Sequence, residues 1–106
     1  MRGHLYTEEE VILCTYAAMY SVNDFGGINK IQSLQNRSLD SIKMKIMNIA
    51  SMLDENKIER FNYDSVFPLT GLSTGRTGRK TNWNIVSKIY KLERNIFLQR
   101  CKEILK

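Results

Sequence analysis

The sequence predicts a mainly α-helical protein with a single domain over residues 1–106. Three patterns carry this prediction: an N-terminal apolar run that follows a helix-capping pair, a central apolar stripe, and a helical C-terminus. A length of 106 residues suits one compact domain. No apolar run approaches the roughly 20 residues that a membrane span needs, so we expect no membrane association.

The first helix is expected to begin after Thr7. Thr7 and Glu10 have the spacing of a capping box, and the two glutamates between them favour the positive end of a helix. Nearly every residue of 11–20 is apolar, so this helix should lie at the centre of the core. Cys14, inside that run, is expected to be a buried thiol without nucleophilic activity.

A third helix is expected between Ser38, a suitable N-cap, and Asn56. A shorter helix, ending near Asn36, should precede it after a break at 23–27. Two helices joined by a short turn, with polar residues at the start of the second, resemble a helix-turn-helix or winged-helix domain. The third helix has an apolar stripe at helical spacing, formed by Ile42, Ile46, Ile49 and Leu53.

The side of the third helix opposite the stripe contains two methionines. Either another segment covers these methionines or they contact a partly apolar ligand. Lys43 and Lys45 should flank the stripe. The residues expected to point away from the core are Asp40, Met44, Met47 and Ser51.

The apolar residues of 57–70 do not recur at a regular spacing, which predicts an irregular segment or a short strand. The chain from Trp83 onward predicts one helix, or two with a break near Leu92.

Charge is divided unevenly along the chain. Residues 1–70 have seven Lys/Arg and nine Asp/Glu, whereas residues 71–106 have nine Lys/Arg and two glutamates. A basic half joined to a mildly acidic half suggests a polyanion as partner. The stretch 71–82 has three glycines, three cations and no acid, which suits contacts with a phosphate backbone.

Two groups of residues are the candidates for DNA contacts. Around the start of the third helix they are Arg37, Ser38, Ser41, Lys43, Lys45 and Asn48. In the glycine-rich stretch they are Ser73, Thr74, Gly75, Arg76, Thr77, Gly78, Arg79 and Lys80.

Catalytic patterns are weak. The glycine-rich stretch lacks the Gly-Lys-[Ser/Thr] ending of a nucleotide-binding P-loop. His4 is the one histidine, and two distant cysteines form neither a metal-ligand pattern nor a disulfide framework. Glu55 and Lys57 match half of a metal-dependent nuclease motif but are better explained as a solvated helix end. We expect no enzyme activity, metal or cofactor in these residues, and an intracellular location.

Residues 36–54 resemble a motif of a prokaryotic restriction-associated family. They match the pattern Arg-[Ser/Thr]-x-x-Ser-[Ile/Val]-x-Met-Lys-[Ile/Leu]-x-Asn-[Ile/Phe]-Ala, followed by Leu-Asp. The first helix and residues 71–73 are similar in looser ways, so that the resemblance spans roughly 6–105. The family is the sulfur-binding domain of phosphorothioate-dependent restriction endonucleases, together with related DNA-reading domains that precede HNH nucleases.

The resemblance implies recognition of duplex DNA in which sulfur replaces a non-bridging phosphate oxygen. It implies a role in prokaryotic host defence, a cytoplasmic location, and an HNH nuclease domain or subunit as the usual partner. The 106 residues depart from the family in containing no such nuclease, so the domain either is separated from its nuclease or reads DNA on its own. The candidates for a shallow apolar cavity around the sulfur are Tyr63, Phe67, Pro68 and Met44.

Three alternatives remain open from the sequence. The domain reads a methylated base or an unmodified DNA sequence, it docks a protein partner through its methionine-bearing face, or it is a metal-dependent nuclease built around Glu55 and Lys57.

Overall fold

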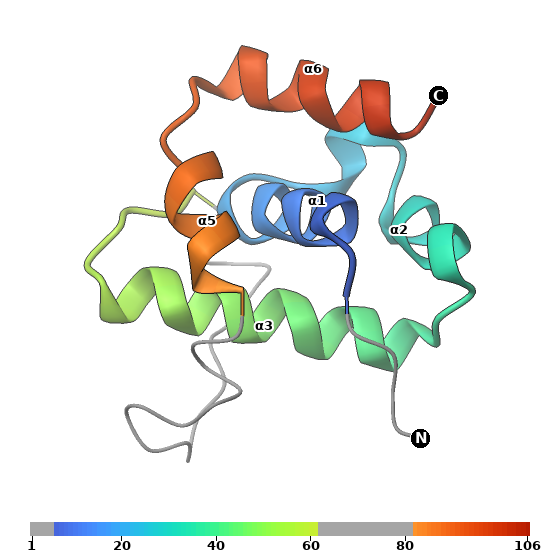
Figure 1. Ribbon diagram of the computed structural model, residues 1–106, viewed down its shortest axis with the longest axis horizontal. Coiled ribbons are helices and arrows are strands. Elements are labelled where there is room, and N and C mark those ends of the chain that lie inside the picture. Colours follow the sequence, from blue (N-terminus) through green and yellow to red (C-terminus); the bar gives the residue numbers. More distant parts are fainter. Residues whose placement is uncertain (1–5, 62–81) are drawn as a thin grey trace.

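The computed structural model describes residues 6–61 and 82–106 of the chain (Figure 1). These ranges contain α-helices, one 3-10 helix and no strand, so the predicted mainly α fold is confirmed. The elements in chain order are α1 (Glu8–Met19), η1 (Val22–Phe25), α2 (Ile28–Gln35), α3 (Leu39–Glu55), α5 (Trp83–Ile89) and α6 (Arg94–Ile104). None of these helices is long and apolar enough to cross a membrane.

Helix α1 is the centre of the molecule, as the apolar run predicted. In Figure 1, α3 passes on one side of α1 and α6 on the other, while α5 and α2 lie at its two flanks. All ten residues of 10–19 are buried. A helix enclosed on every side needs no polar face, which explains why 11–20 has no helical alternation of apolar and polar residues.

The capping box at the start of α1 is present in both directions. The Thr7 hydroxyl accepts a hydrogen bond from the backbone N–H of Glu10 at 3.1 Å, and Glu10 Oε1 accepts one from the backbone N–H of Thr7 at 2.9 Å. Cys14 is fully buried, and burial raises the pKa of its thiol to about 12. A thiol in this environment stays protonated near neutral pH, which agrees with the prediction for Cys14.

Helices α2 and α3 are joined by a three-residue turn. Asn36 ends α2 in the left-handed conformation, with φ of 54°, and Ser38 caps α3 by accepting a hydrogen bond from the N–H of Ser41. The predicted stripe of four aliphatic residues on α3 is buried against the rest of the core. The predicted helix boundaries near Asn36, Ser38 and Asn56 are confirmed.

One prediction for the outer side of α3 is wrong, because Ser51 is fully buried rather than outward. Lys45, expected to flank the stripe and to contact DNA, is only 6% exposed. Residues 49–53 are all buried, so the C-terminal half of α3 is enclosed on several sides and has no single outer face. Met44 does point outward, whereas Met47 is half-buried.

The C-terminal part of the chain forms two helices, and the predicted break near Leu92 separates α5 from α6. Before the undescribed range, residues 58–61 are irregular and end at Phe61. The backbone N–H of Phe61 donates to the carbonyl of Met19 at 2.8 Å, and its ring stacks on Tyr20. Residues 62–70 lie outside the described ranges.

Candidate nucleic-acid interface

The turn between α2 and α3 is fixed to the start of α1 by an ion pair. Arg37 donates from Nε to Glu10 Oε2 at 2.6 Å and from Nη2 to Glu10 Oε1 at 2.9 Å. The Glu10 side chain is fully buried and that of Arg37 is 10% exposed. These hydrogen bonds raise the pKa of Arg37. Arg37 is a predicted DNA contact, but these guanidinium donors are used in the ion pair that holds the turn against α1.

Tyr6 covers the same corner of the molecule. The Arg37 guanidinium lies 3.9 Å from the centre of the Tyr6 ring, and the Lys45 ammonium lies 5.2 Å from it. The Tyr6 hydroxyl is 2.7 Å from the hydroxyl of Ser41. Burial raises the pKa of Tyr6. One aromatic ring thus brings together Arg37, Ser41 and Lys45, three of the predicted site residues.

Sequence reasoning missed Tyr6 and the second role of Glu10. An apolar residue directly before an N-cap often packs back onto its helix as a hydrophobic staple, and Tyr6 occupies that position before Thr7. This signal was sufficient to place the ring near the start of α1. It contained no information about Ser41 or Lys45, which are more than thirty residues away along the chain.

Lys45 connects α3 to the start of α5. Its ammonium donates a hydrogen bond to Asn82 Oδ1, and burial lowers its pKa. Asn82 is the first described residue after the 62–81 range and adopts the left-handed conformation with φ of 72°. The basic stretch 71–82 therefore ends beside the middle of α3.

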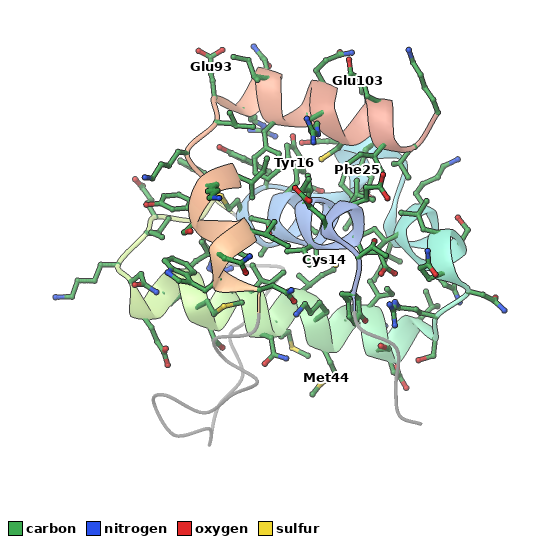
Figure 2. The ribbon with its side chains drawn as sticks, in the orientation of Figure 1. Cys14, Tyr16, Phe25, Met44, Glu93 and Glu103 are labelled. Atoms are coloured by element: carbon green, nitrogen blue, oxygen red, sulfur yellow. The ribbon has the colours of Figure 1, made fainter. Side chains whose placement is uncertain are left out.

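The solvent-facing part of α3 lies in its N-terminal half. Lys43 is exposed, and Met44 is 48% exposed and points away from α1 (Figure 2). Asp40, also exposed, reduces the positive charge of this surface. We call Lys43 and Met44 the α3 surface pair.

Two other predicted DNA contacts, Ser38 and Asn48, lie at positions that are partly structural. Ser38 is exposed, but its hydroxyl is the α3 cap. Asn48 is half-buried, and its Oδ1 atom is buried with no hydrogen-bond partner within the described part of the chain.

The remaining candidates lie outside the described ranges. For the DNA backbone these are Ser73, Thr74, Gly75, Arg76, Thr77, Gly78, Arg79 and Lys80, and for the sulfur cavity they are Tyr63, Phe67 and Pro68.

Among the described residues, most exposed cations belong to the C-terminal part of the chain, 82–106, rather than to α3. Residues 82–106 contain six Lys/Arg against Glu93 and Glu103, and Figure 2 shows both glutamates at α6, across α1 from Met44. Glu55 and Lys57, the residues of the nuclease alternative, are exposed at the end of α3. Within 6–61 and 82–106, no three acidic, histidine or cysteine side chains are grouped as metal ligands.

Comparison with known proteins adds no assignment: no protein-family model, no curated protein and no solved structure matches this chain.

Proposed function

We propose that this domain binds double-stranded DNA as the recognition module of a prokaryotic modification-dependent restriction system, with a preference for a phosphorothioate backbone. The observation that carries the proposal is the α3 surface pair, an exposed methionine next to an exposed lysine on α3, the second of two helices joined by a short turn. In a helix-turn-helix domain the second helix is the usual DNA-reading element.

The chemistry of the pair suits a sulfur-containing phosphodiester. Sulfur is larger and more weakly hydrated than oxygen, so an apolar and polarisable side chain displaces its water at low cost. The modified phosphodiester keeps its negative charge and still requires a cation. Met44 would contact the sulfur side of the linkage, while Lys43 would neutralise its charge.

The motif that resembles the sulfur-binding family has mainly architectural roles here. Arg37 pairs with Glu10, Ser38 caps α3, and Ser41 contacts Tyr6. These contacts hold the α2–α3 connection and the N-terminal end of α3 in one geometry. A preorganised surface loses less entropy on binding. In this proposal the motif shapes the unit, while the DNA contacts come from the α3 surface pair and from residues 71–82.

The first experiment is fluorescence anisotropy at about 150 mM salt with one duplex that contains a single phosphorothioate linkage and its unmodified twin. A preference of tenfold or more, about 1.4 kcal/mol, supports sulfur recognition. Equal binding overturns the sulfur preference and leaves a general DNA-binding domain. No binding to either duplex at about 50 mM salt overturns the whole proposal and favours a protein-interaction module.

Two substitutions test the surface pair separately. Lys43→Gln should weaken both duplexes to the same degree and reduce the salt slope by about one unit. Lys102→Gln, on α6, removes the same charge from an exposed position across α1 and should leave the slope unchanged.

Met44→Ala should reduce the preference for sulfur more than the overall affinity, because it removes the apolar contact and no charge. Ile96→Ala is the matched control, since Ile96 is an exposed apolar residue on α6. An unchanged preference in Met44→Ala would remove Met44 from the sulfur site.

A further inference from the structure

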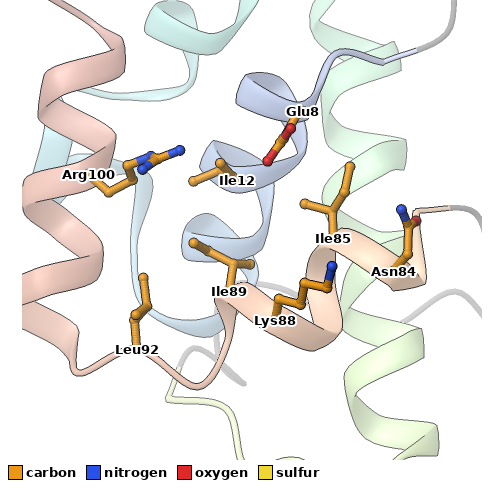
Figure 3. Close-up of a pocket in the computed structure, with 8 residues that line it drawn as sticks. All are labelled: Glu8, Ile12, Asn84, Ile85, Lys88, Ile89, Leu92 and Arg100. Atoms are coloured by element: carbon orange, nitrogen blue, oxygen red, sulfur yellow. The ribbon is translucent and has the colours of Figure 1, made fainter.

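A pocket of about 330 Å³ lies between α1, α5 and α6 (Figure 3). Its volume is at the lower end of the range of small-molecule sites. α3 contributes none of the residues around it, so it is separate from the α3 surface pair. Four aliphatic residues line it, namely Ile12, Ile85, Ile89 and Leu92, together with the polar residues Glu8, Asn84, Lys88 and Arg100.

The aliphatic part of the pocket is incompletely covered. Ile12 is buried in the core, whereas Ile85, Ile89 and Leu92 are each only half-buried. A concave surface with several half-buried aliphatic side chains keeps apolar area in contact with water, and a ligand with an apolar body would remove that contact. This aliphatic half of the lining therefore favours a ligand with an apolar part.

The charged residues around the pocket favour an anionic end on that ligand. Figure 3 shows the Glu8 carboxylate above the aliphatic residues, Arg100 to its left and Lys88 below it, at the opposite edge of the pocket. All three are exposed, and no ion pair within 4.0 Å joins them among the described residues. Two cations against one carboxylate leave a net positive rim, and the Asn84 amide adds hydrogen-bonding capacity.

We infer that this pocket binds a small amphipathic anion, with an apolar body and one carboxylate, of about ten non-hydrogen atoms. The hydrocarbon body packs on Ile85, Ile89 and Leu92, and the carboxylate lies between Lys88 and Arg100. A stable protein–protein interface involves about 20–30 residues of each partner, whereas eight residues line this pocket, so the pocket suits a small molecule better than a protein surface. The inference is independent of DNA binding.

The test is a titration followed by amide NMR spectra of the 106-residue chain near neutral pH, with octanoate, octanol and octylammonium as probes. The three probes share one hydrocarbon body and differ in charge. Octanoate should move the amide signals of α5 and of the Glu8–Ile12 turn, with half-saturation at an octanoate concentration of about 1 mM. Octanol should bind more weakly, and octylammonium most weakly.

Single-charge variants sharpen the test. Lys88→Gln and Arg100→Gln should each weaken octanoate binding about two- to fivefold, the range expected for exposed ion pairs. Glu8→Gln should strengthen it by a similar factor, because the competing carboxylate is removed. Lys102→Gln is the control, since it removes an exposed cation of α6 that does not line the pocket.

Several results would overturn the inference. These are equal binding of octanoate and octylammonium, signal changes confined to other parts of the chain, and no change at about 10 mM octanoate. Pocket signals that respond to protein concentration but not to octanoate would assign this face to a second copy of the chain.

Discussion

The two ends of α3 are held by two arginine–carboxylate pairs that differ in which partner is buried. At the N-terminal end Glu10 is fully buried and Arg37 is slightly exposed. At the C-terminal end the Arg60 side chain is fully buried, whereas Asp54 is 25% exposed. Arg60 binds both carboxylate oxygens of Asp54, at 2.9 and 3.1 Å, and also donates to the carbonyl of Ala18 at 3.3 Å.

The comparison shows how α3 is aligned with α1. Glu10 is near the start of α1 and Ala18 is near its end, so the two pairs tie α3 to both ends of the central helix. A buried charge is tolerated when its partner and its hydrogen bonds are in place, and it is costly when the partner is removed. Removing one partner should therefore lower the free energy of unfolding more at the end where the remaining buried charge loses more of its hydrogen bonds.

The largest effect is expected at the C-terminal pair. Asp54→Ala removes the carboxylate partner of a fully buried guanidinium and should lower the free energy of unfolding by about 3 kcal/mol, measured by urea denaturation. Glu59→Ala, a nearby exposed carboxylate, should change it by less than about 0.5 kcal/mol. Similar losses for the two variants would contradict the structural role of Asp54.

A smaller loss, about 2 kcal/mol, is expected for Arg37→Ala. Glu10 stays buried in that variant, but it keeps its hydrogen bond from the Thr7 backbone. Arg37→Lys keeps the charge without the two-pronged geometry and should fall between the parent and Arg37→Ala in the same urea measurement. A lysine variant as unstable as the alanine variant would mean that the geometry, and not the charge, carries the whole effect.

Loss of the α1 cap should lower the stability of the fold by a smaller amount than loss of either ion pair. Thr7→Ala removes the hydroxyl that accepts from the Glu10 backbone and should reduce stability by about 1 kcal/mol, while Thr7→Ser should stay near the parent. Thermal unfolding followed by circular dichroism measures both. No difference between alanine and serine would show that the capping hydroxyl contributes nothing.

The smallest effect depends on pH and concerns an exposed pair. Hydrogen bonds from Tyr16, and then from Arg94, lower the pKa of Asp24. A carboxyl group with a lowered pKa stabilises the fold at pH values above its ordinary pKa of about 4. This stabilisation is lost as the pH falls below that value. Because Arg94 is more than half exposed, the contribution should be under about 1 kcal/mol.

Asp24→Asn isolates that contribution. The variant should have a lower Tm than the parent near neutral pH, and the difference should shrink as the pH is lowered from about 5 to about 2.5. A difference that stays constant across this range would show that the Asp24 charge is not what stabilises the contact.

Local patterns predicted the helices because they depend on neighbours in sequence. The Thr7 cap, the Ser38 cap and the α3 stripe each involve residues within a few turns of one another, and all three are confirmed. The burial of Lys45 and Ser51, by contrast, depends on which other segments pack over α3. Asn82, the hydrogen-bond partner of Lys45, comes 37 residues later in the chain, so helical spacing alone had no access to that contact.

The candidate site shows the same limit. The sequence identified Arg37 as a cation near a helix start, and charge alone suggested a phosphate partner. The structure gives Arg37 a carboxylate from α1 instead. Met44 has the exposure that the helical spacing predicted, and Lys43, expected beside the stripe, is exposed as well. A cation next to a motif is ambiguous until the burial of every nearby acid is known, and Glu10 showed only its capping role in the sequence.

The complete burial of α1 also has a consequence for synthesis of the chain on the ribosome. Two of the helices that pack on α1 begin at Trp83 and Arg94, more than sixty residues after α1 ends. At about 5–20 residues per second, those helices are made several seconds after α1. During that interval only the N-terminal helices are present to shield the apolar sides of α1, so the nascent chain is most open to chaperone binding before α5 and α6 emerge.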